Sequence, residues 1–403
     1  MTEQLTPPGF TGTGDGFADG ASVLDHAFGT SEQYTLGVEE EYMLLDPETF
    51  DLVQHVDTVL AAVSGNELEV YINPELMQSV LEIATPVCRT AGDIDRELRK
   101  LRAYVCEVAR EQDLRVGSAG THPFSLFERQ RITAKDRYRQ LVDQLQYVAR
   151  SELIFGMHVH CAVDGPEKAI QVVNGLLNHL GQLLALSASS PFWRGETTGL
   201  ASSRQMVFAA LPRSGPPPRF DDYGDYAELV GQLERTGCIA DYTQIWWDIR
   251  LHPRLGTIEV RVCDAVTRVE DAVAIAAYVQ GLVKLYSERF DRGEEIPSFH
   301  RILTSENKWL AARYGLEAPV MDLATGRRNR VPVAQLVRRT LRDIEPHAHE
   351  LGSDRELEGI REILARGNGS DRQLRVFNAN RDIVEVVREI AEATEVAAVG
   401  SPA

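Results

Sequence analysis

The sequence predicts an α+β fold. Strand-like runs at 34–45, 156–163 and 256–263 are mixed with helix-like runs, without the regular strand–helix–strand rhythm of a doubly wound parallel sheet. Hydrophobic residues make up 43% of the 403 residues, which is enough for a sizeable core in one large domain or two ordinary ones. No internal repeat is evident along the chain.

Three segments have the pattern of helices. Residues 90–113 carry apolar side chains at helical spacing, and Thr90 followed by Asp93 is typical of a helix start. Residues 167–188 and 270–288 are apolar on several faces, which predicts buried helices that cover the sheet.

Prolines and glycines predict where this regular structure is interrupted. Arg213–Arg219 contains three successive prolines, so it must be a loop, and it is a candidate lid for a site. From 331 to 395 we expect several helices, with breaks near Pro346 and at Gly367–Gly369.

Both ends of the chain are expected to be tails, a flexible one over 1–33 and a short one over 397–403. The glycines between Phe10 and Phe17 lack the G-x-G-x-x-G spacing, and the chain has no G-x-x-x-x-G-K-[ST] motif. A bound nucleotide would therefore need something other than a Walker loop to hold its phosphates.

Charge and cysteine content exclude several classes of function. The chain has 42 basic and 60 acidic residues, a net charge of −18, and no dense run of Lys and Arg. This disfavours nucleic acid or an anionic membrane as a partner. Five widely spaced cysteines without a C-x-x-C pair, and no export or membrane-spanning signal, favour a reducing cytoplasm.

The first predicted strand, 34–45, carries three consecutive glutamates. Because side chains alternate between the faces of a strand, Glu39 and Glu41 share one face and Glu40 points to the other. The Cα atoms of Glu39 and Glu41 would lie roughly 6.5 to 7 Å apart, close enough for both carboxylates to bind divalent cations. An edge strand with a solvated acidic face explains this segment equally well.

Two later strands repeat the pattern. His158 and His160 share one face of 156–163, and such a pair suits a metal or a phosphate, whereas a lone buried His is more often structural. Glu259 and Arg261 share a face of the third strand, where a structural ion pair is the alternative. One polar cavity lined by a sheet would explain all three strands.

A fourth segment, 73–86, adds Glu75 and Glu82 to this set. Glu82 lies in an apolar stretch, and a buried carboxylate needs a partner. Many carboxylates with one or two imidazoles suit Mg²⁺ or Mn²⁺ better than zinc. Clustered acids beside Arg261 also suggest phosphoryl transfer.

Six motifs, in this order, resemble the type 2 glutamate–cysteine ligases and, among them, the YbdK-like carboxylate-amine ligases. They are G-V-E-E-E-Y at 37–42, N-P-E-L-M-Q-S-V-L-E-I-A-T-P-V at 73–87, G-T-H-P-F at 120–124, G-M-H-V-H at 156–160, I-W-W-D-I-R at 245–250 and T-I-E-V-R-V-C-D at 257–264. Weaker similarity extends through Glu306–Gly315, so the resemblance covers nearly the whole chain.

The resemblance implies a single catalytic domain over 34–396 with a glutamine-synthetase-like fold, in which an antiparallel sheet forms an active-site funnel flanked by helices. It also implies that the γ-carboxylate of glutamate attacks the γ-phosphate of ATP, and that an amine, usually cysteine, captures the acyl phosphate. The YbdK-like branch is linked to weak glutamate–cysteine ligase activity, so the expected reaction type is firmer than the expected substrates. A homodimer is the expected assembly.

Carried over position by position, the resemblance implies roles for individual residues, with Mg²⁺ or Mn²⁺ as the metal and ATP as co-substrate. The implied metal ligands are Glu39, Glu41, Glu82, His158 and Glu259. Glu259 and Arg261 would be catalytic, Arg250 and Arg261 would contact the nucleotide, and His122, His160 and Arg204 would contact substrate. For His122, Arg204 and Arg250 a purely structural role is equally compatible with the sequence, and Glu40 is expected outside the site.

Two other functions remain open from the sequence. A metal-dependent hydrolase could use the His158 and His160 pair, although the other histidines show no ligand-like clustering beyond His347 and His349. A non-catalytic acidic protein would bind divalent ions without turning over nucleotide.

Overall fold

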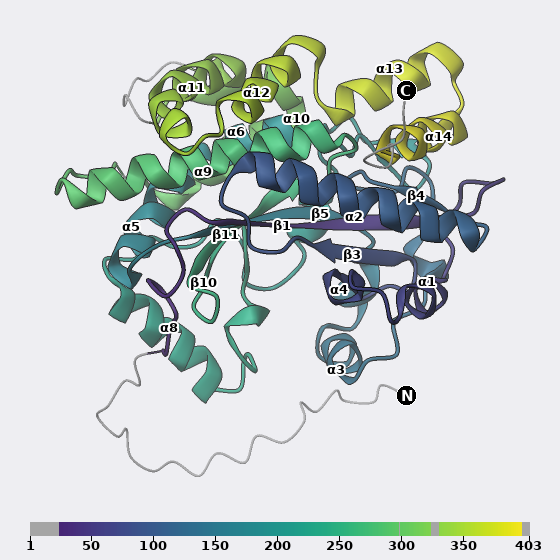
Figure 1. Ribbon diagram of the computed structural model, residues 1–403, viewed down its shortest axis with the longest axis horizontal. Helices are drawn as coiled ribbons and strands as arrows, with labels where there is room; N and C mark the ends of the chain where they lie inside the picture. The colour runs from purple at the N-terminus through teal and green to yellow at the C-terminus, as the bar shows by residue number, and fades with distance from the viewer. Residues whose placement is uncertain (1–23, 298, 324–329, 397–403) are drawn as a thin grey trace, which may run out of the picture.

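The computed structural model describes residues 24–297, 299–323 and 330–396 (Figure 1). Most of the predicted tails, 1–23 and 397–403, lie outside the described residues. Among the residues that the structure describes, no helix is both long and apolar enough to cross a bilayer.

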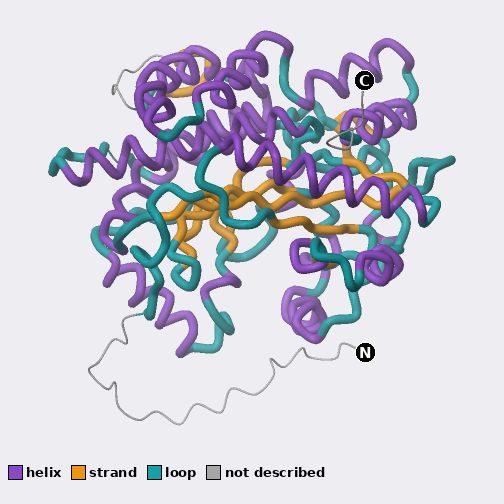
Figure 2. Tube along the Cα trace, viewed as in Figure 1, coloured by secondary structure: helices purple, strands orange, loops and turns teal. Residues whose placement is uncertain are grey.

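The described residues form a seven-stranded antiparallel sheet through the middle of the molecule (Figures 1 and 2). The strand order is β10-β11-β5-β1-β3-β2, and β4 pairs with the C-terminal end of β1. The strands are β1 (Leu36–Leu45), β2 (Ile72–Pro74), β3 (Val80–Ala84), β4 (Arg115–Gly117), β5 (Gly156–Ala162), β10 (Ile249–His252) and β11 (Thr257–Asp264).

Helices cover one face of this sheet in two layers (Figure 1). The two long helices α2 and α9 pack on the sheet and on each other, and α11 and α12 pack on the outer side of α9. The helices on this side are α2 (Ala91–Glu111), α5 (Pro166–Leu176), α6 (Leu180–Ser187), α9 (Val269–Asp291), α10 (Arg301–Tyr314), α11 (Val333–Glu350), α12 (Asp354–Arg366), α13 (Gly369–Asn380) and α14 (Ile383–Thr394).

Shorter elements surround the other face. Helices α3, α4 and α8 lie below the sheet in Figure 1, and they leave its middle open. These elements are α1 (Val56–Val63), α3 (Asp136–Leu145), α4 (Tyr147–Ser151), α7 (Arg204–Phe208), α8 (Tyr223–Arg235), the 3₁₀ turns at Glu69–Tyr71, Phe127–Arg129 and Tyr242–Gln244, and the small pairs β6 (Phe192–Trp193) with β7 (Glu196–Thr197) and β8 (Ser214–Gly215) with β9 (Trp246–Trp247). The 3₁₀ turns at Leu177–His179 and Gly315–Glu317 and the pair β12 (Pro319–Met321) with β13 (Arg330–Pro332) pack instead against α5, α6, α10 and α11.

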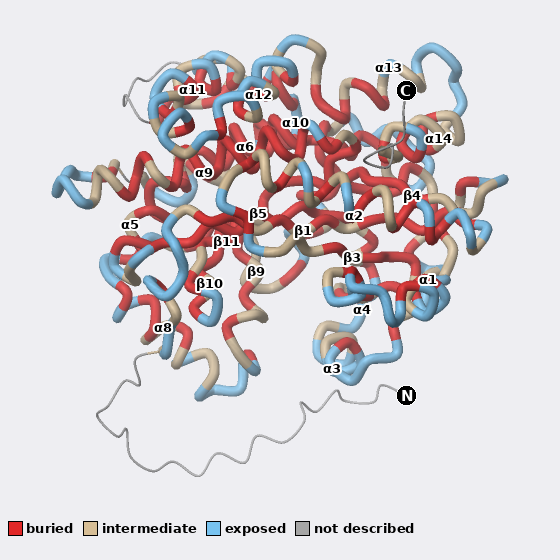
Figure 3. The backbone as a smooth tube through the Cα atoms, viewed as in Figure 1, coloured by how far each residue is buried: buried red, intermediate tan, exposed pale blue. Residues whose placement is uncertain are grey.

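The helices predicted for 90–113, 167–188 and 270–288 are confirmed as α2, as α5 with α6, and as α9. The predicted start of α2 is a capping box, in which Thr90 accepts a hydrogen bond from the Asp93 backbone and Asp93 accepts one from the Thr90 backbone. Figure 3 shows that α9 and the central strands are mostly buried, as their apolar sequences require.

The predicted break near Pro346 is wrong, because α11 continues through this proline to Glu350. Pro346 lacks the N–H that a helix interior uses, but Ile344 and Ala348 on either side of it are fully buried, and α11 packs on α9. Burial of this apolar face offsets the missing hydrogen bond. The predicted break at Gly367–Gly369 is confirmed, with α12 ending just before Gly367, whose φ is +90°.

The expected N-terminal tail is shorter than predicted, because residues 24–33 already contact the domain. Phe28 is buried, the backbone N–H of Ala27 donates to the carbonyl of Pro253, and that of Gly29 donates to the carbonyl of Val163. The low hydrophobicity of residues 1–33 as a whole concealed this apolar anchor.

A buried ion pair joins the central strand to the helix layer. Glu40 points away from Glu39 and Glu41, as the alternation predicted, and lies under α2. Arg102 of α2 donates from Nε to one Glu40 oxygen at 2.9 Å and from Nη2 to the other, and its remaining donors reach the carbonyls of Val266 and Thr267. The side chains of Arg102 and Glu40 are 0% and 1% exposed, so water does not contribute to this pair.

We expect Glu40→Gln to lower the free energy of unfolding by about 3–5 kcal/mol, because it leaves the buried Arg102 charge without a counter-charge. Denaturant unfolding measures this loss, with Glu32→Gln as the matched control. Glu32 pairs with Arg89 at the exposed surface, where removing a charge costs less than about 1 kcal/mol. Equal losses in the two variants would contradict a stabilising role for the buried pair.

Candidate active site

Charged and imidazole side chains form one continuous row across the open face of the sheet. Its members either face each other across neighbouring strands or lie two residues apart on one strand, so the register itself assembles the row. The cross-strand partners are Glu82 with Glu41, Glu39 with His158, His160 with Glu259, and Glu259 with Arg250.

Arg261 lies at the same place, two residues after Glu259 on β11, as the alternation of side chains predicted. The pairing of β11 with β5 shifts register between Val260 and Cys263, next to Arg261. The guanidinium of Arg261 lies against Glu259, to which its Nη1 donates a hydrogen bond.

The row forms the floor of a cavity of about 360 Å³. Side chains of α3, α4 and α7 and of the segment from Thr243 to Trp246 form its walls. No residue of Arg213–Arg219 lines this cavity, and Pro216 and Pro217 are buried elsewhere, so the structure does not support the predicted lid.

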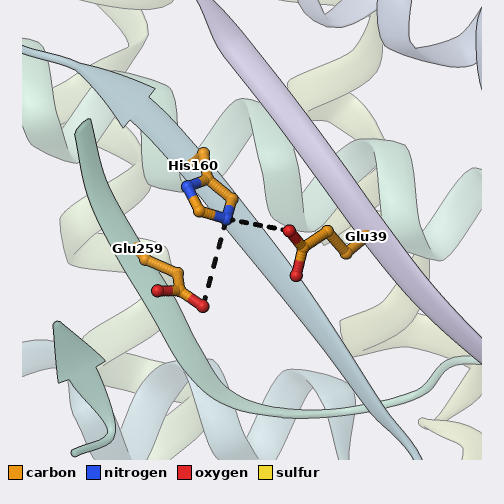
Figure 4. A group of neighbouring side chains, drawn as sticks. All are labelled: Glu39, His160 and Glu259. Carbon is orange, nitrogen blue, oxygen red and sulfur yellow. Dashed lines mark ion pairs between the residues drawn. The ribbon is translucent and has the colours of Figure 1, made fainter. Parts of the chain in front are cut away.

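Glu39, His160 and Glu259 form the group best arranged to hold a metal ion among the described residues (Figure 4). One ligand atom from each lies within 4.8 Å of the others. His160 Nε2 lies 3.3 Å from Glu39 Oε1 and 3.9 Å from Glu259 Oε1. This Nε2 atom is buried and makes no hydrogen bond to any described residue, so its lone pair or proton is left for a ligand.

His158 contacts the same two carboxylates from the other side. Its Nδ1 donates to Glu39 Oε2 at 2.9 Å and lies 3.9 Å from Glu259 Oε1. Burial and the nearby Arg261 lower the pKa of His158 to about 4, which keeps the ring neutral. His160 lies between Glu39 and Glu259, and these carboxylates raise its pKa although burial opposes them.

Two arginines hold Glu259 in place. Arg250 donates from Nε at 2.8 Å and from Nη2 to the two Glu259 oxygens, and its Nη1 donates to the carbonyl of Thr243. Burial opposes ionisation of Glu259, but Arg250 and Arg261 outweigh it and hold the pKa of this carboxyl well below its usual range. Arg250 therefore positions Glu259, whereas the buried Nε of Arg261 has no partner among the described residues.

The other end of the row is acidic and lacks such cations. Burial and the neighbouring Glu75 raise the pKa of Glu41 to about 7, and burial and the surrounding carboxylates raise the pKa of Glu82 well above its usual range. Glu75 lies in the same cavity, and burial raises its pKa as well. Crowded, desolvated carboxylates of this kind favour an added cation.

His122 is the one predicted site residue that the structure does not bring to the cavity. It is buried, its Nε2 lies 2.9 Å from the carbonyl of Phe50, and its Nδ1 accepts hydrogen bonds from the backbone N–H groups of Phe124 and Ser125. Both ring nitrogens of His122 therefore form hydrogen bonds with backbone groups. The expected substrate contact at His122 is replaced by a structural role.

Arg204 does lie in the cavity, at the start of α7, and Glu152 beside it was not identified from the sequence. Glu152 follows α4 in a segment without a clear period, so no local pattern distinguished it from a surface glutamate. Only the tertiary structure brings it to the cavity.

Comparison with known proteins gives a consistent result. The family model described as glutamate-cysteine ligase family 2 matches residues 35–392. A protein of Rubrobacter xylanophilus named "Putative glutamate--cysteine ligase 2-1" is 43% identical over 371 residues, which cover 92% of this chain and 97% of that protein. A "Putative glutamate--cysteine ligase 2" of Solibacter usitatus is 41% identical over 361 residues, 90% of this chain and 93% of the relative.

Two solved structures share the fold at low sequence identity. The glutamate–cysteine ligase of Francisella tularensis, solved in complex with AMP, superposes with a TM-score of 0.65 at 13% identity and covers 91% of this chain and 90% of its own. A bifunctional glutathione synthetase of Pasteurella multocida gives 0.64 at 16% identity over 90% of this chain and 53% of its own. The predicted α+β, glutamine-synthetase-like fold is confirmed.

A glycine makes room for Arg204, and this contact can be tested directly. A Cβ at Gly156 would collide with the guanidinium of Arg204, which is the flexible end of a side chain. We expect Gly156→Ala to fold with nearly unchanged stability but to move this guanidinium. A crystal structure and thermal unfolding of the variant check both outcomes.

Gly165→Ala is the matched control, since an added Cβ there meets nothing within 4 Å. It should leave Arg204 in place. An unmoved guanidinium in Gly156→Ala would contradict the close approach described above.

Proposed function

Since this chain belongs to glutamate-cysteine ligase family 2, a family of ATP-dependent ligases, we propose that it joins the γ-carboxyl group of glutamate to an amine through an acyl phosphate. Cysteine is the first amine to test, because the relatives are named after it. The support within the chain is the row of carboxylates, imidazoles and guanidinium groups on the floor of one cavity.

The chemistry needs two displacements. An oxygen of the glutamate γ-carboxylate bonds to the terminal phosphorus of ATP while the bond to the ADP oxygen breaks. The amine nitrogen then bonds to the acyl carbon, phosphate leaves, and the amine loses a proton. Phosphorylation is required because a free carboxylate is a poor acylating agent.

The charges of the cavity suit the first displacement. Phosphoryl transfer depends mainly on positioning and on positive charge around the moving group. Arg261 offers that charge, and Glu259 orients it through a direct hydrogen bond while Arg250 holds Glu259. Arg261 is therefore our candidate for contact with the transferred phosphoryl group.

The donor set fits Mg²⁺ or Mn²⁺, which prefer oxygen ligands and accept an imidazole. Glu39, His160 and Glu259 would hold one ion, with His158 on the opposite side of Glu39. Glu41 and Glu82 remain candidates for further ligands in the same cavity. When bound, such an ion neutralises phosphate charge.

We also propose a cytoplasmic homodimer. The five cysteines are unpaired, as in proteins of reducing compartments.

The substrates would all be small molecules, namely ATP, an amino-acid carboxylate and an amine. Neither the hydrolase nor the non-catalytic alternative requires ATP to be consumed, so turnover of ATP separates them from the ligase.

Phosphate release from ATP with Mg²⁺ should require both an amino-acid carboxylate and an amine, with glutamate and cysteine as the first pair and mass spectrometry identifying the amide. Glu39→Gln should lower kcat at least about a hundredfold, because it removes a charge from the centre of the site. Glu67→Gln, at an exposed site, is the matched control and should retain full activity. Release of phosphate without either substrate would refute the ligase proposal.

Glu259→Gln should also abolish turnover, but it additionally leaves Arg250 and Arg261 without their counter-charge and should lower stability. Glu39→Gln is therefore the cleaner variant.

The two histidines should differ in metal binding. His160→Gln should weaken Mn²⁺ binding about 10- to 100-fold, because its free Nε2 lies within the ligand group, while His158→Gln should have the smaller effect. Electron paramagnetic resonance of free Mn²⁺ measures both affinities, with the exposed His349→Gln as control. The opposite ranking would favour His158 as the ligand, as the family resemblance implies.

A further inference from the structure

An arginine and a glutamate in the cavity form no ion pair with any residue that the structure describes. Arg204 is 2% exposed, its Nε makes no hydrogen bond, and it forms no ion pair with any described residue. Its other two nitrogens only approach the carbonyl of Arg261, both at 3.5 Å. The buried Oε1 of Glu152 likewise has no hydrogen-bond partner among the described residues.

These two groups are close enough to interact but do not pair. Both line the same cavity, and Arg204 influences Glu152 electrostatically, yet Arg204 Nε and Glu152 Oε1 have no hydrogen-bond partner among the described residues. Burial raises the pKa of Glu152 to about 8, although Arg204 acts to lower it. A carboxyl group in this state gains from a cation placed beside it, and an unpaired buried guanidinium gains from an anion.

Hydrogen bonds hold the backbone of Arg204 in place. Its backbone N–H donates to Ser190 Oγ at 3.2 Å, and the hydroxyls of Ser190 and Ser202 both donate to the fully buried Asp264. The guanidinium packs over the ring of Phe208, 5.3 Å from its centroid. An anchored backbone and a packed side chain reduce the freedom that Arg204 loses when it binds a ligand.

The wall between the two charges is apolar. Ala149, Ile154, Phe208 and Leu211 line the cavity together with Glu152 and Arg204. A ligand at this wall thus meets a cation, an anion and aliphatic or aromatic surface.

We propose that an amino-acid substrate of the ligase binds here as a zwitterion, with its α-carboxylate at Arg204 and its α-ammonium group at Glu152. Glu152 is then the residue that selects substrates carrying an α-amino group. This assignment rests on the proposed function, because it takes the ligand to be one of the two amino acids that are joined.

Other ligands of this cavity fit the pair less well. A phosphate group would meet Arg204 favourably but would be repelled by Glu152, and a metal ion would meet the reverse. The α-carboxylate and α-ammonium groups of an amino acid satisfy both side chains, and these two groups together add no net charge.

The test is isothermal titration calorimetry on the full chain with Mg²⁺ and a non-hydrolysable ATP analogue. The probes are L-glutamate with glutarate, and L-cysteine with 3-mercaptopropionate; in each pair the second compound lacks only the α-amino group. Glu152→Gln should weaken binding of one amino acid about tenfold or more and leave the matching compound without the amino group unaffected. Whichever pair responds identifies the bound amino acid.

Arg204→Gln tests the proposed contact with the α-carboxylate. It should weaken binding of the same amino acid and of its analogue without the amino group alike, but not of 4-aminobutyrate or cysteamine, which lack the α-carboxylate. Glu67→Gln, with a side chain that is 80% exposed, is the control for loss of a negative charge. Thermal unfolding confirms that each variant is folded.

Equal weakening of both members of a pair by Glu152→Gln, or no weakening of either, would overturn the zwitterion site. If amino acids still drive phosphate release in that case, the ligase proposal stands and only this inference fails. If no amino acid binds and none drives phosphate release, both fail.

Discussion

The cost of burying carboxylates along β1 is the constraint on which the rest of the structure depends. Three consecutive glutamates lie in the central strand of the sheet, and alternation sends them to both faces. In a desolvated environment each charge needs a counter-charge or a proton. On the helix-covered face the chain supplies that charge itself, through Arg102, and thereby ties α2 to β1 and to the segment after β11.

On the open face only some of the carboxylates have a counter-charge, and this difference defines the site. Glu259 is neutralised by two arginines, and Glu39 lies within 3.3 Å of ring nitrogens of His158 and His160. Glu41, Glu75 and Glu82 form no ion pair with a described residue, and burial raises the pKa of each. One end of the cavity therefore has paired charges, and the other end has excess negative charge. Cationic ligands are favoured at the negative end.

Much of this could be predicted from local sequence because it depends on the two-residue period of strands. That period separated Glu40 from Glu39 and Glu41, and paired His158 with His160. The strand period cannot predict contacts between segments that are distant in the sequence. Nothing near Arg102 indicated its pairing with Glu40, and His122 lies in a family-like motif although its ring nitrogens serve the backbone. The position of Glu152 in the cavity and the register shift in β11 likewise depend on tertiary structure.

The three glutamates also act on the folding of the sheet. A slip of β1 by one residue against β3 and β5 would exchange the two faces, since every side chain changes sides. Glu39 and Glu41 would then lie beneath α2, where Arg102 offers one positive charge for two carboxylates, and Glu40 alone would face the cavity. The charge pattern that serves the site thus penalises the misregistered sheet, so the E-E-E segment specifies strand alignment as well as chemistry.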